Sequence, residues 1–257
     1  MPEIPDIEVF SRNLKDLLAN KQVAKVKVVN GKKLMDSPKE LSKALEGQKV
    51  LDVYRSGKEL RITFSKNVIL GIHLMLTGDL FFEKTNERKS TIVEIHFKDR
   101  SILILNDRMK NASVKLNPVD KGGIDALDKN LNFKKLKEIL NRKTAIKNVL
   151  LDQDAIRGIG NSYSDEILWQ TRISPFSKAN AIPDEKIKEL VVVIKKVLKD
   201  ATKTIYKNHP GKINGEVKDY LQIHTKHKTE SPTGSTILIA SRGMLKTYYT
   251  KEQVVYE

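Results

Sequence analysis

The sequence predicts an α+β protein with an N-terminal β-sandwich, a helical domain and a C-terminal β-hairpin. In the first half of the chain, short runs rich in Val, Ile, Leu and Phe are separated by links of Gly, Asn, Asp and Lys. That pattern is typical of a sandwich or barrel. From Phe133 onward the apolar residues recur with the period of a helix, and strand-like runs return only near the C-terminus.

One helix precedes the strands. Ile7, Phe10, Leu14 and Leu18 recur at helical spacing after Pro5-Asp6, which is a helix start signal. The strands expected after it cover residues 26–29, 60–64, 68–76, 91–97 and 101–105. Together these elements form the predicted sandwich domain, residues 1–118.

The segment 119–130 is predicted to be a linker, because it contains Gly122-Gly123 and shows no periodicity. A helical domain follows over residues 131–222, and the last domain covers residues 223–257. Helices are expected over 133–140, 145–151, 162–169 and 187–205. The hairpin is expected to have strands over 235–240 and 246–249, joined through Ser241-Arg242-Gly243.

The charge of the chain favours a polyanionic partner. Lys and Arg number 47 against 32 Asp and Glu, which gives a formal net charge of +15. Such an excess most often indicates nucleic acid, although lysines that only solvate the surface of a basic protein remain the alternative. The chain has no cysteine, which excludes disulfides and thiolate metal sites.

Neither a membrane segment nor a signal peptide is expected. The longest apolar runs are far shorter than the roughly 20 residues that span a bilayer. The N-terminus carries Glu3, Asp6 and Glu8, where a signal peptide would be basic and then apolar. We therefore expect a protein of the reducing cytoplasm.

The first residues, Met1-Pro2-Glu3, offer a nucleophile. Removal of Met1, which a small following residue permits, would leave Pro2 with a free secondary amine. Because an α-amino group titrates near 8, much of it is unprotonated at neutral pH and can form an imine with a sugar carbon. Glu3 beside it could donate or accept a proton. An uninvolved terminus is the alternative reading of so short a motif.

A second motif runs from Arg157 through Gly158-Ile159-Gly160-Asn161 into a predicted helix. Two glycines before a helix N-terminus make a tight turn whose backbone N–H groups suit a phosphate. Asn161 could donate to that phosphate or cap the helix.

Together these segments resemble the Fpg/Nei family of DNA glycosylases. The N-terminal signature is 1–8, the helix–two-turns–helix motif is 147–172, and Ser56-Gly57-Lys58 and the run 73–78 resemble two motifs of the β-domain. The resemblance covers essentially the whole chain in the right order. It implies a β-sandwich, a helical DNA-binding domain and a C-terminal finger.

By the same resemblance Pro2 is the nucleophile at C1′ of the damaged nucleotide and Glu3 is the general acid–base. Lys58 would contact phosphate and assist the chemistry, and Asn161 would hold the phosphates that flank the flipped nucleotide. No cofactor is implied. The partner is damaged double-stranded DNA, the protein is expected to be a monomer, and its compartment is the bacterial cytoplasm or nucleoid.

The sequence departs from the family pattern at several positions. Asp6 stands where Glu is usual, and a hairpin without cysteines stands where the family usually has a zinc finger, so we expect a zincless finger. His224 and His227 lack further ligands, and no metal is expected. Leu245 occupies the position of the usual finger arginine, so that Arg242 or Lys246 must supply the cation.

The side chains that fill the gap left by a flipped base also differ. Leu76 stands where methionine is usual and is predicted to enter the gap. The loop 107–112 would supply the rest from Met109 or Lys110 and Asn111. Asn111 in place of an aromatic residue predicts weak stacking on the opposite base.

The expected function is that of a bifunctional glycosylase and lyase of base excision repair, which removes oxidised bases through a proline imine and cuts the strand by β,δ-elimination. A noncatalytic relative that binds damaged DNA is the alternative. Retention of Pro2, Glu3 and Lys58 argues against it, because binding alone needs none of them. An RNA-binding protein is supported only by the charge.

Overall fold

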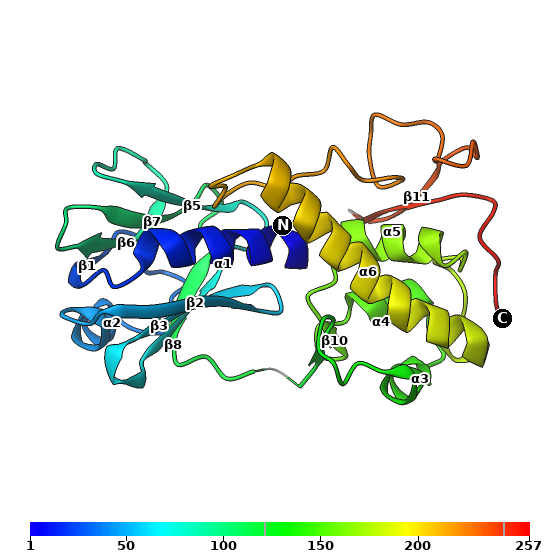
Figure 1. The fold of residues 1–257 in the computed structure, drawn as a ribbon, viewed down its shortest axis with the longest axis horizontal. Coiled ribbons are helices and arrows are strands. Elements are labelled where there is room, and N and C mark those ends of the chain that lie inside the picture. The colour runs from blue at the N-terminus through cyan, green and yellow to red at the C-terminus, as the bar shows by residue number, and fades with distance from the viewer. Residues whose placement is uncertain (121, 244) are drawn as a thin grey trace. The chain divides into compact units, whose positions relative to one another are not determined.

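The computed structural model describes residues 1–120, 122–243 and 245–257. The chain divides into two compact units, one of Met1–Asp120 with Thr204–Glu216 and one of Lys121–Lys203 with Val217–Glu257. Most strands lie in the first unit and most helices in the second (Figure 1), so the predicted α+β class is confirmed.

The first unit is a β-sandwich. Its strands form two antiparallel four-stranded sheets, in the orders β1-β6-β7-β5 and β2-β3-β4-β8. The elements are α1 (Ile4–Leu18), β1 (Val23–Val28), α2 (Pro38–Leu45), β2 (Val50–Ser56), β3 (Glu59–Phe64), the 3-10 turn η1 (Ser65–Asn67), β4 (Ile69–His73), β5 (Gly78–Glu83), β6 (Thr91–Phe97), β7 (Ile102–Asp107) and β8 (Ser113–Leu116).

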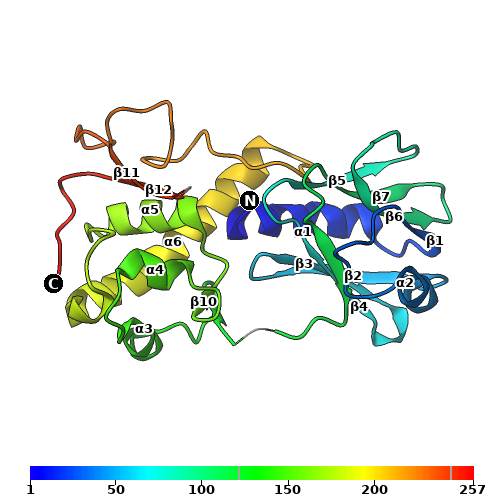
Figure 2. The ribbon, with the colours of Figure 1, turned by 180° about the vertical axis from the view of Figure 1, so that it is seen from behind.

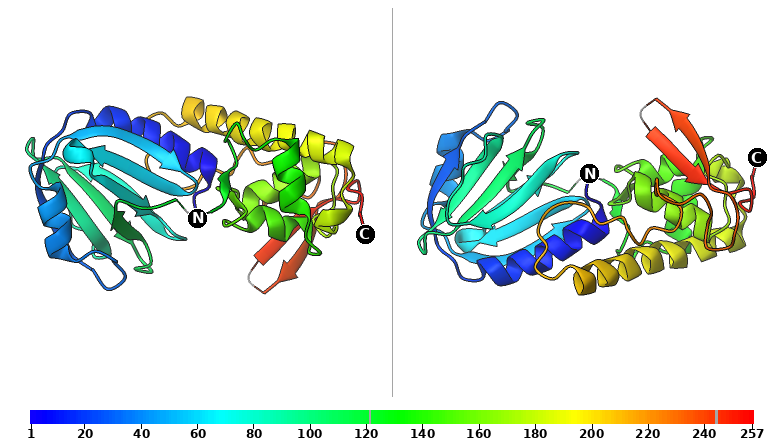
Figure 3. Two further views of the ribbon diagram at one scale, coloured as in Figure 1. Left: turned by 90° about the horizontal axis from the view of Figure 1, so that it is seen from below. Right: turned by 90° about the horizontal axis from the view of Figure 1, so that it is seen from above.

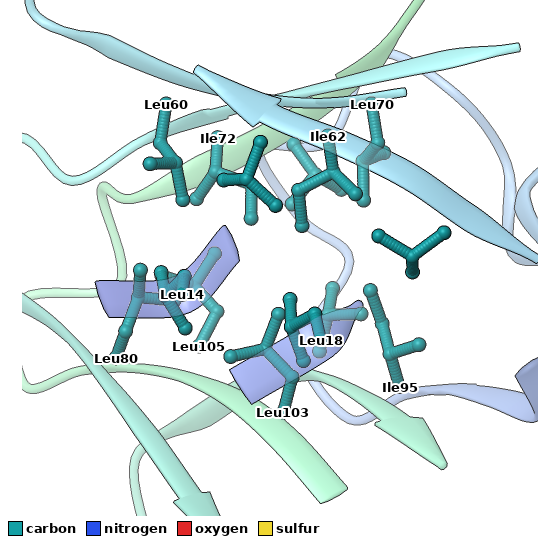
Figure 4. Close-up of a cluster of buried hydrophobic side chains, with 14 of the residues drawn as sticks. Leu14, Leu18, Leu60, Ile62, Leu70, Ile72, Leu80, Ile95, Leu103 and Leu105 are labelled. Carbon is teal, nitrogen blue, oxygen red and sulfur yellow. The ribbon is translucent and has the colours of Figure 1, made fainter. Parts of the chain in front are cut away.

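The core of this unit lies between the two sheets (Figure 4). One sheet contributes branched side chains from β3 and β4, the other contributes them from β5, β6 and β7, and α1 adds Leu14 and Leu18. The sheet residues are Leu60, Ile62, Leu70, Ile72, Leu80, Ile95, Leu103 and Leu105, none more than 3% exposed. Burying each such side chain stabilises the fold by about 1.5–3 kcal/mol.

Local signals account for the elements that the sequence analysis missed or merged. The predicted strand 68–76 is wrong beyond His73, because the chain turns at Met75 (φ +55°) and the Gly78 N–H donates to the Leu74 carbonyl at 2.9 Å. Helix α2 begins with a capping box in which Ser37 and Glu40 satisfy each other's backbone N–H groups. The spacing of Ser37 and Glu40 is the sequence signal for this helix start.

The second unit contains the helices and the terminal hairpin. Its elements are β9 (Ile124–Asp125), α3 (Phe133–Leu140), α4 (Ile146–Leu151), β10 (Ile156–Arg157), α5 (Asn161–Gln170), the 3-10 turn η2 (Ala179–Ala181), α6 (Asp184–Asn208), β11 (Leu238–Arg242) and β12 (Leu245–Tyr249). The last residues of α6, from Thr204 onward, group with the first unit. The hairpin of β11 and β12 projects from the helices of its unit (Figure 3). Within the described ranges, no helix combines the length and the apolar character needed to cross a bilayer.

Two segments differ from the organisation that the sequence suggests. The expected linker 119–130 contains β9, which pairs in parallel with β10. The end of α6 and the residues after it group with the sandwich, although the sequence places them in the helical domain. Hydrogen bonds explain this: Asn13 Nδ2 donates to the Lys212 carbonyl at 2.7 Å, and Asn214 Nδ2 to the Leu80 carbonyl at 3.0 Å. Such contacts leave no periodic pattern, and the domain boundaries stay a prediction.

Candidate functional site

The N-terminal residues are fixed at the start of α1. Pro2 and Glu3 are both buried, and Glu3 is only 5% exposed. Glu3 is the N-cap of α1, and its backbone N–H donates to the Asp6 carboxylate at 3.2 Å. Asp6 therefore helps to close the first helical turn, a role that its short side chain can fulfil.

Met1 precedes this segment, and its ammonium group forms an ion pair with Glu216. While Met1 is present, the Pro2 nitrogen is part of a peptide bond, whose resonance removes its nucleophilic lone pair. Any chemistry at Pro2 therefore requires removal of Met1.

Lys58 lies in the two-residue turn that joins β2 to β3, where Ser56 is opposite Glu59. Gly57 has φ +59°, a conformation that glycine adopts without strain and that such hairpin turns require. Arg55 donates to the Gly57 carbonyl at 3.0 Å, and its Nε to Glu8 of α1 at 3.2 Å. The turn that carries Lys58 is thus braced against the helix that follows Pro2 and Glu3.

Electrostatics link Lys58 to Glu3. Lys58 is 9% exposed, and burial lowers its pKa from the usual value, while the charge of Glu3 acts in the opposite direction. Among the described residues, none is hydrogen-bonded to the Lys58 ammonium group. The structure therefore places an incompletely partnered lysine within electrostatic reach of the carboxylate next to Pro2.

The glycine-rich turn leads into α5 as the sequence predicts. Gly158 has φ +103°, and its N–H donates to Gln153 Oε1 at 2.9 Å, while Gln153 Nε2 donates to the Ile159 carbonyl at 2.9 Å. The N-cap of α5 is Gly160, so the alternative that Asn161 caps the helix is wrong. Instead, Asn161 Nδ2 donates to the Lys246 carbonyl at 2.9 Å.

The residues expected to fill a gap in DNA lie on exposed turns. Leu76 is 61% exposed between β4 and β5, and Met109 is 53% exposed after β7. Lys110 is also exposed, with φ +56°. Neither Leu76 nor Met109 is a core residue, and their role at the gap stays a prediction.

These turns are organised by Asp107, a residue that the sequence does not single out as functional. Asp107 is fully buried and accepts hydrogen bonds from the N–H groups of Asn111 at 2.6 Å and Ala112 at 2.7 Å. It also accepts from the Thr77 hydroxyl, next to Leu76. These bonds lower the Asp107 pKa in spite of burial. The available signal was an acidic residue two positions after the end of the predicted strand 101–105.

Comparison with known proteins decides the family. The model of the formamidopyrimidine-DNA glycosylase N-terminal domain matches residues 1–114, and that of the formamidopyrimidine-DNA glycosylase H2TH domain matches residues 123–208. A formamidopyrimidine-DNA glycosylase of Lactobacillus gasseri is 32% identical over 279 aligned positions, covering 100% of both chains. This chain belongs to the formamidopyrimidine-DNA glycosylase family. A relative from Mycoplasma genitalium with the same name is 30% identical over 88% of this chain and 86% of its own.

Solved structures of this family share the fold. A complex between the Lactococcus lactis enzyme and DNA containing an abasic site superposes with a TM-score of 0.86 at 21% identity, covering 97% of this chain and 98% of that one. A complex of the same species' enzyme with DNA containing an oxidised pyrimidine also gives 0.86, at 23% identity. The fold expected from the family resemblance is therefore confirmed.

Three residues of the hairpin finger were singled out from the sequence, and the structure describes the side chains of two of them. Leu245, at the position of the usual arginine, is 38% exposed, and Lys246 beside it is exposed. Arg242 pairs with Leu245 across the hairpin, but its side chain lies outside the described part of the structure. The exposed Lys246 therefore offers the finger a cation that is accessible to a ligand.

No metal centre is apparent where the zinc of other fingers would be expected. The chain has no cysteine, and among the described residues no group of three His, Asp or Glu side chains could hold an ion. His224 Nδ1 instead lies 2.7 Å from Asp165 Oδ2. The absence of a metal and of a cofactor stays a prediction.

Proposed function

We propose that this chain removes oxidised bases from DNA in base excision repair and then cuts the strand, acting as a bifunctional DNA glycosylase and lyase. One observation carries the proposal: the buried Pro2-Glu3 segment and the buried Lys58 lie within electrostatic reach in a member of the formamidopyrimidine-DNA glycosylase family. A protein that only bound DNA would gain nothing from an amine, a carboxylate and a lysine held in this way.

The chemistry follows from the functional groups. The damaged nucleotide is extruded from the duplex at a cost of a few kcal/mol. After Met1 is removed, the Pro2 amine attacks C1′, the bond to the base breaks, and the base leaves with the electron pair. Loss of the proton on nitrogen and opening of the sugar ring then give an iminium at C1′. Glu3 protonates the ring oxygen as it leaves. Loss of a proton from C2′, next to the iminium, then expels the 3′ phosphate, and loss of a second proton, from C4′, expels the 5′ phosphate, which cuts the strand on both sides of the sugar.

Positioning of the DNA is assigned to groups outside the covalent chemistry. Lys58 and Asn161 would hold the phosphates beside the lesion. The Asn161 amide nitrogen has two hydrogens, so one can reach a phosphate while the other stays on the Lys246 carbonyl. Lys110, Lys246 and Arg242 would contact the backbone, and Leu76 would enter the gap left by the nucleotide.

The same proposal defines the partners and the compartment. The substrate is damaged double-stranded DNA, bound by a monomer without a cofactor, and the net charge of +15 suits this polyanion. The relatives described above come from bacteria, which supports action in the bacterial cytoplasm or nucleoid.

Borohydride trapping on a duplex with an abasic site tests the proposal. Borohydride reduces the imine to a stable amine, so the processed chain should become covalently attached to DNA. A chain whose N-terminus carries an uncleaved tag should bind the duplex but give no adduct. Equal trapping by the tagged chain would show that Pro2 is not the nucleophile. Binding without trapping by the processed chain would favour the noncatalytic alternative. Pro2→Ala is a poor test, because a primary amine also forms imines.

A further inference from the structure

The second unit contains a buried carboxylate that serves three elements at once. Asp165 of α5 has no exposed surface in its side chain. Its Oδ1 lies 2.5 Å from Lys147 Nζ, and its Oδ2 accepts from the Tyr248 N–H at 2.9 Å. The His224 ring completes the set at 2.7 Å from Oδ2. We call Lys147, Asp165, His224, Thr247 and Tyr248 the finger anchor.

Each member of the finger anchor contacts at least one other member. Lys147 Nζ, whose side chain is 5% exposed, also donates to Thr247 Oγ1 at 2.9 Å. The His224 ring lies against Tyr248 with centroids 4.6 Å apart. The neighbouring Glu166 accepts the N–H groups of residues 222, 223 and 224 at 2.8–2.9 Å and so holds His224 in place. The anchor therefore joins α4, α5 and the segment before the finger to β12.

The geometry shows why a helix can hold a strand here. Asn161 and Asp165 are one turn apart on α5, a rise of about 6.0 Å. Lys246 and Tyr248 are two residues apart on β12, a rise of about 6.6 Å. Asn161 donates to the Lys246 carbonyl, and Asp165 accepts from the Tyr248 N–H. Two side chains of α5 therefore pair with the edge of β12 almost as a neighbouring strand would.

This pairing satisfies an edge that the hairpin leaves open. Strand β12 pairs with β11 in the register Ala240 opposite Thr247, and α5 lies beside β12 in Figure 2. A two-stranded hairpin is marginally stable alone, and this one has no cysteine to bind a metal. The finger anchor supplies the fixation that a metal would otherwise provide.

We infer that Asp165 is a positioning residue for DNA binding, which holds β12 on α5 so that Asn161 and Lys246 are presented together to one stretch of DNA backbone. This inference rests on the proposed function. It assigns Asp165 no part in the covalent chemistry, because Pro2, Glu3 and Lys58 belong to the other unit. Loss of the Asp165 carboxylate should therefore weaken binding of the duplex without lowering the trapping rate of the enzyme–DNA complex.

A pair of variants separates positioning from simple stability. Asp165→Asn leaves the buried Lys147 without a counter-charge, so it should lose both stability and affinity. The double variant Asp165→Leu with Lys147→Met removes both buried charges, and such replacements are often neutral or stabilising. The double variant still leaves the Tyr248 N–H without its acceptor. Because both buried charges are gone, the double variant should recover the free energy of unfolding. Because the Tyr248 N–H has lost its acceptor, β12 should not return to its position on α5.

The experiment uses the full processed chain and a duplex with a tetrahydrofuran abasic analogue for affinity, together with single-turnover trapping on an abasic duplex. Hydrogen exchange of the Tyr248 amide reports the anchor directly. Asp152→Asn is the matched control, since it removes the same charge from the same unit and its partners, Arg142 and Asp154, lie outside the finger.

We expect the double variant to melt near the parent temperature, to bind about tenfold or more weakly, and to exchange the Tyr248 amide faster. Its trapping rate at saturating DNA should match that of the parent. Affinity within twofold of the parent, or a trapping rate that falls as much as the affinity, would overturn the inference. If the parent itself gives no adduct, the proposed function has failed, while the effect on affinity still tests the anchor.

Discussion

Two buried lysines, one in each unit, show how the same residue type serves two purposes. Lys147 is 4% exposed and has both Asp165 and Thr247 as hydrogen-bond partners. Lys58 is 9% exposed, yet among the described residues no side chain is hydrogen-bonded to its ammonium group, and its pKa is lowered by burial. The first lysine is fully engaged by the protein, whereas the second is left available.

The difference in hydrogen-bond partners between Lys147 and Lys58 indicates which lysine is available to bind DNA. A buried charge without a hydrogen-bonded partner destabilises the folded protein, so a fold retains one only where it brings an advantage elsewhere. Near Pro2 and Glu3, the proposed function supplies that advantage, because the Lys58 cation would bind a phosphate of the DNA. In the finger anchor, the partners are already inside the protein, and the lysine contributes structure.

Substituting the two lysines in the same way should give opposite results. Lys147→Met leaves Asp165 buried without its cation and should lower the free energy of unfolding by about 3–5 kcal/mol. Lys58→Met removes a poorly partnered buried charge and should leave that free energy equal or higher. Urea denaturation of both variants measures this. Equal destabilisation by the two substitutions would remove the distinction.

The kinetic effects should be reversed. Lys58→Met should slow single-turnover trapping about 10- to 150-fold, as expected for a lost hydrogen bond to a charged group. Lys147→Met, assayed below its melting temperature at saturating DNA, should trap at nearly the parent rate. A normal trapping rate for Lys58→Met would mean that its burial has no catalytic purpose.

Asn161→Ala sharpens the comparison on the side of the second unit. Loss of its hydrogen bond to a phosphate should weaken DNA binding about 10- to 150-fold. Because Asn161 is neutral, the slope of log affinity against log salt should stay the same, whereas Lys58→Ala should reduce it by about 0.9. Fluorescence anisotropy at several salt concentrations provides both values. Near-parental affinity of Asn161→Ala would exclude a phosphate contact.

The smallest expected effect concerns pH. The pKa of Lys58 is below 10.5 in the folded protein, so between its folded value and 10.5 the unfolded chain binds more protons. Stability attributable to Lys58 should therefore rise with pH across that window and level off above 10.5. The difference in unfolding free energy between the parent and Lys58→Met, measured at pH 7 to 10, should shift in favour of the parent. A constant difference would contradict the lowered pKa.

Periodicity and local signals in the sequence predicted much of the architecture. The repeat of Ile7, Phe10 and Leu14 predicted α1, and the two glycines before Asn161 predicted the turn into α5; both are confirmed. The residue types at Pro2, Glu3 and Lys58 indicated the chemistry through a family resemblance, and the family is confirmed. Their individual roles stay predictions.

Long-range polar contacts could not be predicted from the sequence. The hydrogen bonds from Thr77 to Asp107 and from the Tyr248 N–H to Asp165 join residues 30 and 83 positions apart, and no local pattern encodes such pairs. The recurrence of Asn161 and Asp165 on one helical face was visible, but not the strand that they hold. The grouping of Glu216 with the sandwich could not be predicted for the same reason.

Mapping the trapped adduct tests the central claim most directly, because Lys58, with its lowered pKa, is a second amine that could form an imine. After trapping on an abasic duplex, nuclease and protease digestion followed by mass spectrometry locates the sugar remnant. We predict that it lies on the N-terminal peptide, on the nitrogen of Pro2, and that Lys58→Met gives the same adduct more slowly. An adduct on Lys58 or on another lysine would contradict the assignment of Pro2 as the nucleophile.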